Sequence, residues 1–251
     1  AVNIPLLYPN IEEHIKSIID LKVPIVFTSA GNPNIWTKEL KQKNIKVVHV
    51  VSSVNFAIKA ESSGVDAIVA EGFEAGGHNG IEETTTMCLV PDVAKAINVP
   101  LIAAGGIIDG KSMLAAMILG ADGVQMGTRF VASKESSAHE NFKNMVLKAK
   151  EGDTRLTLKE ITPVRMMKNK FYKEVEELYK SSPSKEQLLN KLGRGRAKLG
   201  MFEGDLEAGE LEIGQASSQI NKVFTAQEII QQIVTEFNSI KSQISLVNKF
   251  N

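Results

Sequence analysis

Six short apolar runs recur in the first half of the chain, and their spacing constrains the fold more than any other feature. The runs begin about 20 to 35 residues apart. They are rich in Val, Ile and Ala without strict alternation, which is typical of parallel strands buried on both faces. Segments with helical periodicity lie between them, so the rhythm predicts an α/β fold, either a βα barrel or a doubly wound sheet. The runs cover residues 1–7, 24–30, 45–51, 66–72, 100–106 and 122–128, and the clearest helical segments between them are 10–22 and 110–120.

The absence of an early glycine-rich dinucleotide fingerprint favours the barrel over the doubly wound sheet. A TIM-type (β/α)8 barrel has eight strands, whereas six runs precede residue 130. We therefore expect the numbering to begin partway into a longer protein, after two βα units of roughly 60 residues. A complete six-stranded open sheet is the alternative.

The sequence changes character after residue 130, where helical patterns replace strand-like runs. We expect helices over 135–150, 169–181, 185–192 and 226–244, with a glycine-rich loop of mixed charge over 193–215. Lids and inserted segments commonly cover barrel active sites, which suggests a helical cap. The predicted organisation has three parts: 1–150 as the barrel portion, 151–225 as a helical and loop cap over the active site, and 226–251 as a C-terminal helix packing on the barrel.

Composition excludes several classes of protein. Lys plus Arg and Asp plus Glu both total 29, and this zero net charge argues against a nucleic-acid binder. No apolar run approaches the roughly 18 residues that a membrane helix needs, and nothing at the start resembles a signal peptide, so we expect a cytoplasmic protein without a membrane segment. Cys88 is the single cysteine, which excludes an internal disulfide framework and a cysteine metal cluster; we expect it to be a buried small hydrophobe.

Glycines gather where three of the predicted strands end. The stretch "AEGFEAGGHNG" (70–80) places Gly76, Gly77 and His78 after the fourth run. Backbone N–H groups at the ends of the next two runs would form an anion pocket suited to phosphate, and barrels carry such a pocket after their last two strands. The pocket residues are Gly105 and Gly106, which end the fifth run, and Gly127 and Thr128, which end the sixth. The plainer alternative is that these glycines only end strands and that His78 is structural.

Several motifs together resemble a known family. "EGFEAGGHNG", "TTTMCLVPDV", "PLIAAGGIIDG", "GADGVQMGTRF" and "ESSAHENFK" are similar to the nitronate monooxygenases, once called 2-nitropropane dioxygenases, a family that also contains FMN-dependent enoyl-acyl-carrier-protein reductases. The resemblance runs over nearly the whole chain. It implies a TIM-type barrel that binds FMN non-covalently, and it supports the expectation of two further strands before Ala1.

The resemblance also implies roles for individual residues. His78 of "GGH" matches the catalytic base of the family, and glycines beside it would let the backbone approach a flat ring system. A base of this kind would take the α-proton of a substrate while the flavin accepts electrons. The cofactor-binding residues implied by the motifs and the glycine turns are Asn3, Glu71, Gly76, Gly77, Gly105, Gly106, Gln125, Met126, Gly127 and Thr128, with no metal site.

The expected function is an FMN-dependent nitronate monooxygenase that oxidises a small-molecule nitronate with dioxygen. Two alternatives would share the same site residues, namely an NAD(P)H-dependent enoyl-acyl-carrier-protein reductase and an NAD(P)H:quinone reductase. A non-catalytic flavin-binding barrel is a fourth alternative, which the placement of His78 disfavours. A homodimer is left open.

The remaining histidines and a basic cluster give weaker signals. We expect His14 to be solvated and His139 to serve local structure, and His49 to point into the core or, less favoured, toward the site. Thr28 and Ser29 end a strand and could line the substrate pocket. The cluster of Arg194, Arg196 and Lys198 is interpreted as a solvated loop.

Overall fold

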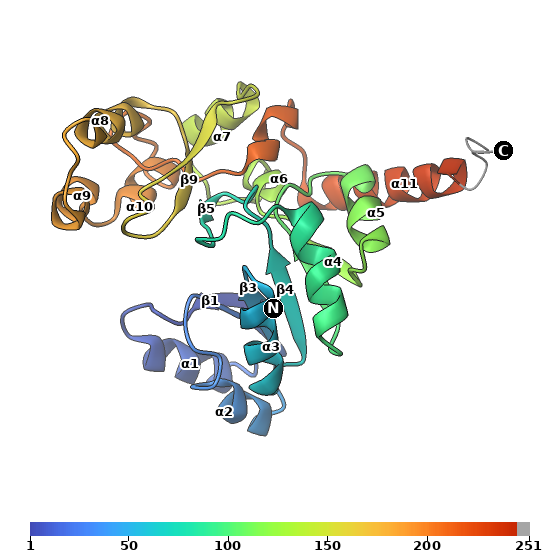
Figure 1. Cartoon of the computed structure of the whole chain (residues 1–251). Coiled ribbons are helices and arrows are strands. Elements are labelled where there is room, and N and C mark those ends of the chain that lie inside the picture. Colours follow the sequence, from blue (N-terminus) through green and yellow to red (C-terminus); the bar gives the residue numbers. More distant parts are fainter. Residues whose placement is uncertain (245–251) are drawn as a thin grey trace. The chain divides into compact units, whose positions relative to one another are not determined.

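The structure of the chain, a computed structural model, describes residues 1–244. Residues 245–251 of the predicted segment 226–251 lie outside the described part. The chain divides into two compact units, and many of their helices and strands are labelled in Figure 1. The first unit comprises residues 1–72, 84–104 and 116–125, and the second comprises 73–83, 105–115 and the chain from Met126 onward. Each unit is therefore assembled from segments that are separated in sequence.

A six-stranded sheet forms the centre of the first unit, in the order β1-β2-β3-β4-β6-β7 with every neighbouring pair parallel. Every strand lies within one of the six predicted runs. Sequential parallel neighbours are the arrangement of a (β/α)8 barrel, so the predicted fold class is confirmed, with six barrel strands in the described residues. The strands are β1 (Val2–Pro5), β2 (Ile25–Ser29), β3 (Lys46–Val51), β4 (Ala67–Glu71), β6 (Leu101–Ala104) and β7 (Gly123–Gln125).

Helices alternate with these strands along the chain. The predicted helices over 10–22 and 110–120 are confirmed as α1 and α5, and the three others were not singled out from the sequence. Both α3 and α4 contact β4, which covers that central strand. The helices are α1 (Ile11–Asp20), α2 (Thr37–Gln42), α3 (Val54–Ser62), α4 (Thr86–Ala96) and α5 (Gly110–Ile118), the last of which crosses the boundary between the two units.

The central strands are buried along their length because residues on both faces are covered. Val47 and Val48 are consecutive in β3 and both are buried, and the same holds for Ile68 and Val69 in β4. Consecutive strand residues point to opposite faces, so a continuous apolar run is the pattern that such a strand requires. This explains why the runs lack alternation.

Two aspartates fix the register at the amino ends of neighbouring strands. Asp66 precedes β4; its Oδ2 accepts a hydrogen bond from the Val47 N–H (2.9 Å), while its own N–H donates to the Val47 carbonyl (2.7 Å). Asp122 precedes β7 and exchanges the same pair of bonds with Leu101, at 2.9 Å and 2.7 Å. The sequence repeats the device in "GVDAIVA" and "GADGVQM". A one-residue slip would break both bonds of a pair, so each aspartate opposes it.

The second unit contains a small antiparallel sheet in the order β5-β9-β8, surrounded by helices. The strands are β5 (Gly77–His78), β8 (Thr154–Thr157) and β9 (Val164–Met167). The helices are α6 (Thr128–Val131), α7 (Glu140–Leu147), α8 (Lys170–Tyr179), α9 (Lys185–Leu192), α10 (Arg196–Met201), the 3₁₀ helix η1 (Gln215–Gln219) and α11 (Ala226–Ile244).

The helices predicted over 135–150, 169–181, 185–192 and 226–244 are confirmed as α7, α8, α9 and α11. The prediction of a continuous loop over 193–215 is wrong, because it contains α10. Arg196 anchors this helix: its guanidinium donates to the carbonyls of Leu192 (2.7 Å) and Ala208 (2.7 Å) and stacks over Phe171 at 4.5 Å. The basic cluster is therefore partly structural, since these long-range contacts hold Arg196.

Strand β9 is the centre of the second unit's core. Val164 and Met166 pack in one cluster with Phe171, whereas Met167 packs in another with Phe142. Strand residues alternate between faces, so β9 connects the two clusters. The antiparallel sheet is thus covered on both sides at this strand.

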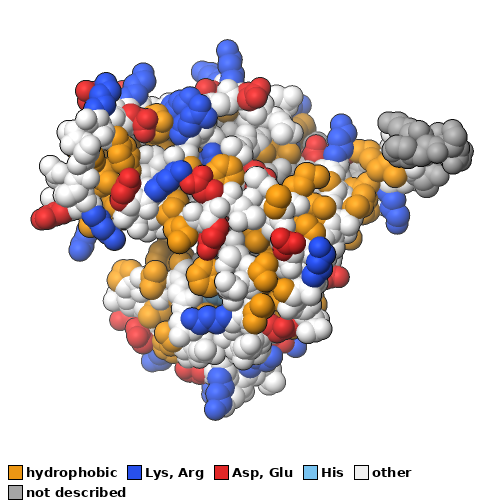
Figure 2. Space-filling model, viewed as in Figure 1, with side chains coloured by type: hydrophobic (Ala, Val, Ile, Leu, Met, Phe, Trp, Pro, Cys, Tyr) orange, Lys and Arg blue, Asp and Glu red, His pale blue; other side chains and the backbone are white. Residues whose placement is uncertain are grey.

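Charges of both signs are mixed over the protein. On the face displayed in Figure 2, Lys and Arg side chains are interspersed with Asp and Glu and with apolar groups, as the zero net charge suggests. In the part of the chain that the structure describes, no helix combines the length and the apolar character that crossing a bilayer demands.

Candidate active site

Two buried polar side chains lie next to each other near the carboxyl edge of the first unit's sheet. Thr28 Oγ1 in β2 lies 2.7 Å from His49 Nδ1 in β3, and both residues are buried. Burial lowers the pKa of His49 from 6.5 to about 4, so the ring is neutral at physiological pH. Of the two predicted positions for His49, the structure supports the core. The Thr28 hydroxyl likewise makes its contacts within the sheet, to His49 and to the Val48 carbonyl.

The predicted cofactor contacts of the first unit are carried by three strands. Asn3 lies exposed on β1 opposite Phe27, and Gln125 ends β7 opposite Ala104. Glu71 ends β4 and is partly buried; burial raises the pKa of its carboxyl from 4.5 to about 7. A carboxyl that titrates near neutrality can give or take a proton, which makes Glu71 chemically notable. Their contact with a cofactor stays a prediction.

The chain passes from the first unit to the second at the ends of β4, β6 and β7. The glycines that follow β6 adopt backbone angles that require glycine: φ is 93° at Gly105 and 69° at Gly106. A Cβ added to Gly106 would lie 3.3 Å from the Cβ of Glu74. The turn therefore packs against the loop that carries Gly76, Gly77 and His78.

The turn after β7 leaves space. A Cβ added to Gly127 would meet nothing within 4 Å, and α6 begins at the next residue. Thr128 is already in use, because its hydroxyl accepts a hydrogen bond from the Gly214 N–H at 3.0 Å. Met126 precedes these residues. Open space beside a helix start is suited to an anion, although Gly127 itself is not forced to be glycine by packing.

Two polar atoms near this turn lack hydrogen-bond partners. Among the described residues, the buried side-chain atoms without a partner are Arg129 Nη1, in α6, and Ser217 Oγ, in η1. These two short helices contact each other. Arg129 lies over the Phe224 ring at 5.5 Å, and burial lowers the pKa of its guanidinium. Both atoms could bind a phosphate oxygen, and an anion would relieve the cost of burying the cation.

The glycines before His78 serve packing within the second unit. A Cβ on Gly76 would lie 2.4 Å from the carbonyl carbon of Ile213 and 2.5 Å from the amide nitrogen of Gly214. Gly77 has φ of 78°, and a Cβ there would lie 2.7 Å from Glu212 Oε2. Residues 212–214 thus lie directly against Gly76 and Gly77. The need for glycine at these two positions has a reason that is independent of any ligand.

His78 combines a fixed backbone with an exposed side chain. His78 is exposed, and its backbone lies opposite Val164 in the antiparallel pair of β5 and β9. The following residue, Asn79, donates its amide to the carbonyls of Ala75 and Gly77, both at 3.0 Å, and its N–H to Pro163 at 2.8 Å. The loop is therefore held on both sides of an imidazole that a ligand can reach. This is the arrangement that a proton-transferring residue needs.

Sequence reasoning missed two charged residues in this region. Arg165, in β9, is 2% exposed, and it donates through Nε (3.1 Å) and Nη2 (2.8 Å) to the carbonyl of Phe73 while stacking on that ring at 4.6 Å. Its signal is a single charge inside the apolar run "PVRMM". Glu212 is the other, beside Gly77. The residues around Glu212 in the sequence give no signal that would single it out.

Cys88, His14 and His139 all lie on or next to helices. The prediction that Cys88 is buried is wrong: it lies exposed on α4, because the buried face of that helix is formed by Leu89, Val90 and Val93. His14 is exposed, as predicted. His139 serves local structure, as predicted, since its Nδ1 accepts the Asn141 N–H at the start of α7 (3.1 Å).

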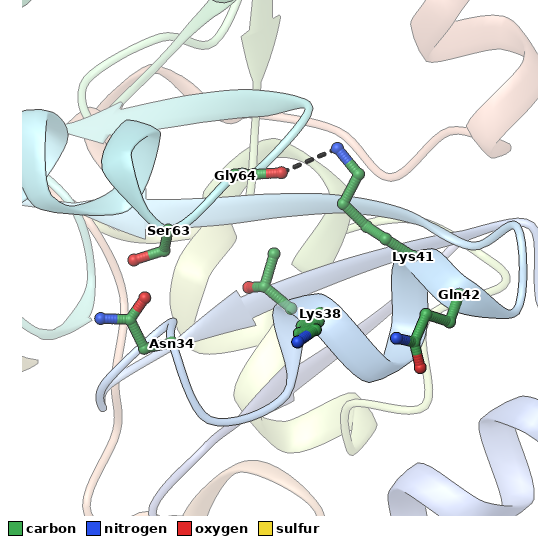
Figure 3. A pocket seen from close by; sticks show the side chains of 7 residues that line it. Asn34, Lys38, Lys41, Gln42, Ser63 and Gly64 are labelled. Carbon is green, nitrogen blue, oxygen red and sulfur yellow. Dashed lines mark hydrogen bonds between the residues drawn. The ribbon is translucent and has the colours of Figure 1, made fainter.

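A surface pocket of about 580 Å³ lies elsewhere in the first unit, and Figure 3 shows its side chains. The Lys41 ammonium donates to the Gly64 carbonyl (2.8 Å) and pairs with Asp66 at 3.3 Å. Burial alone would raise the pKa of Asp66, but the Val47 N–H and the ammonium groups of Lys46 and Lys41 lower it. The pocket lies beside α2 and the residues that follow α3, and the charge of Lys41 is committed to structure. It is lined by Asn34, Thr37, Lys38, Lys41, Gln42, Ser63 and Gly64.

A parallel βα sheet of barrel order, with glycine turns after its strands, defines an α/β protein of the barrel class. The chain belongs to the nitronate monooxygenase family, because the family model described as "Nitronate monooxygenase" matches residues 2–236.

Individual relatives agree with this assignment. A "Probable nitronate monooxygenase" of Staphylococcus aureus is 36% identical over 237 residues, covering 90% of this chain and 66% of that protein. One of the same name from Staphylococcus saprophyticus is 36% identical over 247 residues, covering 92% of this chain and 68% of the other. The chain thus spans about two thirds of the length of these relatives.

Two solved structures are similar to most of this chain. FabK from Thermotoga maritima is 40% identical, with a TM-score of 0.89 over 97% of this chain and 77% of that one. A nitroalkane oxidase from Streptomyces ansochromogenes is 25% identical, with a TM-score of 0.77 over 93% of this chain and 70% of the other.

Proposed function

We propose that this chain is the cofactor-binding and catalytic portion of an FMN-dependent oxidoreductase that oxidises alkyl nitronates with dioxygen. The observation that carries the proposal is the exposed His78 ring on a loop fixed against Pro163 and the 212–214 segment. Family membership supports it, as do the names of the curated relatives.

The residues of the second unit fit the phosphate end of FMN. The donors for a single phosphate are the partnerless Arg129 Nη1 and Ser217 Oγ, and the open space at Gly127 and the left-handed turn at Gly105 and Gly106 lie in the same unit. Asn3, Glu71, Gln125, Met126, Thr128, Gly76 and Gly77 complete the predicted cofactor set. When bound, the flavin would supply the electron-accepting centre, chemistry that no side chain offers.

The protein's own contribution is proton transfer and positioning. A neutral nitroalkane must lose its α-proton before it becomes a nitronate, and the His78 ring is the group that we propose takes it. The C–H bond breaks, an N–H bond forms on the imidazole, and the electron pair remains on the substrate. A positioned base of this kind contributes typically ~10²–10⁴-fold to the rate.

The cofactor can be tested without activity. Denaturing the flavin-loaded protein should release FMN, with a single phosphate, and no FAD. Colourless protein that cannot be reconstituted with FMN would overturn the cofactor assignment and every site role that depends on it.

Anaerobic mixing then tests the reaction. Flavin-loaded protein is mixed with propionate 3-nitronate in one experiment and with NADH in another, and the flavin absorbance is followed. Bleaching by the nitronate, followed by recovery when dioxygen is admitted, supports the proposal. Bleaching by NADH alone contradicts it.

A specific observation favours a second candidate, an NAD(P)H-dependent enoyl-acyl-carrier-protein reductase. The identity to FabK, 40%, exceeds the 36% to the probable nitronate monooxygenases. The substrate here would be an enoyl thioester. The same anaerobic experiment separates the two, because this candidate requires reduction by a nicotinamide and no response to the nitronate.

A further inference from the structure

Glu212 and His78 lie along the same edge of β9, with Gly77 between them. On that edge His78 pairs with Val164 and Gly77 with Arg165, and the next position, Met166, forms an antiparallel bridge with Glu212. The segment containing Glu212 therefore continues the edge that β5 begins, although it is more than a hundred positions away in sequence.

The carboxyl of Glu212 is turned toward the glycine that precedes His78. Its Oε2 occupies space only 2.7 Å from the position of a Gly77 Cβ, so any larger residue at 77 would displace it. The left-handed backbone of Gly77, with φ of 78°, forms part of the same contact. The glycine thus makes room for the carboxyl beside the histidine.

Electrostatics couple the two side chains. Burial raises the pKa of Glu212, and the charge of His78 acts in the opposite direction and lowers it. Other ionisable groups lie on the packed elements. Glu210 is repelled by Glu212 and attracted by Arg196. The Arg165 guanidinium is bonded to the Phe73 carbonyl and interacts with the charges of Glu74, Arg155 and Glu83. A positive charge on His78 is thus the interaction that opposes burial at Glu212 and lowers its pKa.

We propose that Glu212 is a positioning residue for His78, holding the imidazole through its adjacent carboxylate and stabilising the imidazolium that forms when the ring takes the substrate proton. The proposal rests on the proposed function, in which His78 is the base. A base oriented by a third group is a recurring catalytic arrangement.

The role has a specific chemical consequence. As the substrate C–H bond breaks and the imidazole N–H bond forms, positive charge develops on the ring, and a neighbouring carboxylate lowers the energy of that state. A pre-formed nitronate has already lost the proton, so its oxidation gains nothing from Glu212. The residue should therefore matter for one form of the substrate and little for the other.

The kinetic test compares nitroethane with ethyl nitronate in the flavin-loaded protein. In Glu212→Gln, kcat/KM for nitroethane should fall about 10-fold or more, up to the ~10²–10⁴-fold that the base itself contributes, while that for the nitronate changes little. Glu210→Gln is the matched control, because Glu210 is a buried glutamate two positions away. In this variant the ratio of kcat/KM for nitroethane to kcat/KM for ethyl nitronate should stay near that of the parent. Glu212→Asp should restore part of the loss. Equal loss on both substrates would indicate a structural role and overturn the proposal.

A second measurement does not depend on turnover. The Glu212 carboxyl is followed by ¹³C NMR as a function of pH in the parent and in His78→Gln, and it is assigned by its loss in Glu212→Gln or its displacement in Glu212→Asp. Removing His78 should raise the pKa of Glu212 further, because the opposing charge is gone. An unchanged titration overturns the pairing. If the parent oxidises neither nitro substrate, the proposed function fails, and this titration alone decides on the pair.

Discussion

Replacing Gly76 with alanine tests how the histidine loop is held within the second unit. The added methyl group would lie 2.4 Å from the Ile213 carbonyl carbon and 2.5 Å from the Gly214 nitrogen. These are backbone atoms, about 1 Å short of the 3.4 Å at which ordinary contact begins, so no side-chain rotation can relieve the clash. The 212–214 segment must move away from the loop.

The cost follows from what that movement disturbs. Overpacking in a close-packed region costs typically ~1–3 kcal/mol. Two hydrogen bonds hold the same contact, from the Gln215 N–H to the Glu74 carbonyl (2.9 Å) and from the Gly214 N–H to Thr128 Oγ1 (3.0 Å), and each contributes about 0.5–1.5 kcal/mol. We expect Gly76→Ala to destabilise the protein by roughly 2–4 kcal/mol, which lowers Tm by about 5–15 °C in a chain of this length.

Thermal unfolding followed by far-UV circular dichroism measures the effect. Gly123→Ala is the control, because a Cβ there meets nothing within 4 Å, and its stability should change by less than about 0.5 kcal/mol. If the two variants unfold at the same temperature as the parent, the loop does not pack on residues 213–214 as described. The explanation of the paired glycines would then be wrong.

Three further predictions concern the site and its surroundings. Gly106→Val should lose FMN retention, because φ of 69° disfavours a branched side chain and its Cβ would come within 3.3 Å of Glu74; retention as tight as in the parent would place the phosphate elsewhere. Burial and repulsion by Glu212 raise the pKa of Glu210 from 4.5 to about 7, so ionising this carboxyl lowers the folding stability as pH rises from about 4.5 to 7. Glu210→Gln should therefore stabilise the protein by roughly 1–3 kcal/mol near pH 8 and have little effect near pH 4. Denaturant titrations at both pH values measure this difference. His78→Ala should retain FMN and its oxidised spectrum while steady-state turnover of neutral nitroalkanes falls ~10²–10⁴-fold and that of nitronates falls much less; equal activity on all substrates would make the histidine structural.

The sequence predicts the sheet well because its determinants are local. A strand buried on both faces must be apolar at every position, as at Ile68 and Val69, and the chain must form a helix before the next parallel strand. Both requirements concern consecutive residues, so they are visible in the sequence. The glycine clusters after the strands are visible for the same reason.

The second unit is harder because its contacts join distant segments. Arg165 binds the carbonyl of Phe73, 92 positions away, and Glu212 reaches the histidine loop from still farther. Neither residue lies in a periodic pattern that would predict which residue it contacts. The sequence singles out Gly76 as a cofactor-binding residue, whereas its packing against the backbone of residue 213 could not be inferred from the sequence. The exposure of Cys88 likewise depends on which face of α4 is buried.

The repeated passage of the chain between the two units affects how such a protein can change. Segments 73–83 and 105–115 leave the first unit, join the second and return, so neither unit corresponds to one continuous stretch of coding sequence. A single cut cannot excise either unit, and recombination at one point cannot exchange it for another. We expect the second unit of such a protein to diversify by point substitutions and by insertions within loops, while its histidine loop and the sheet of the first unit are inherited together.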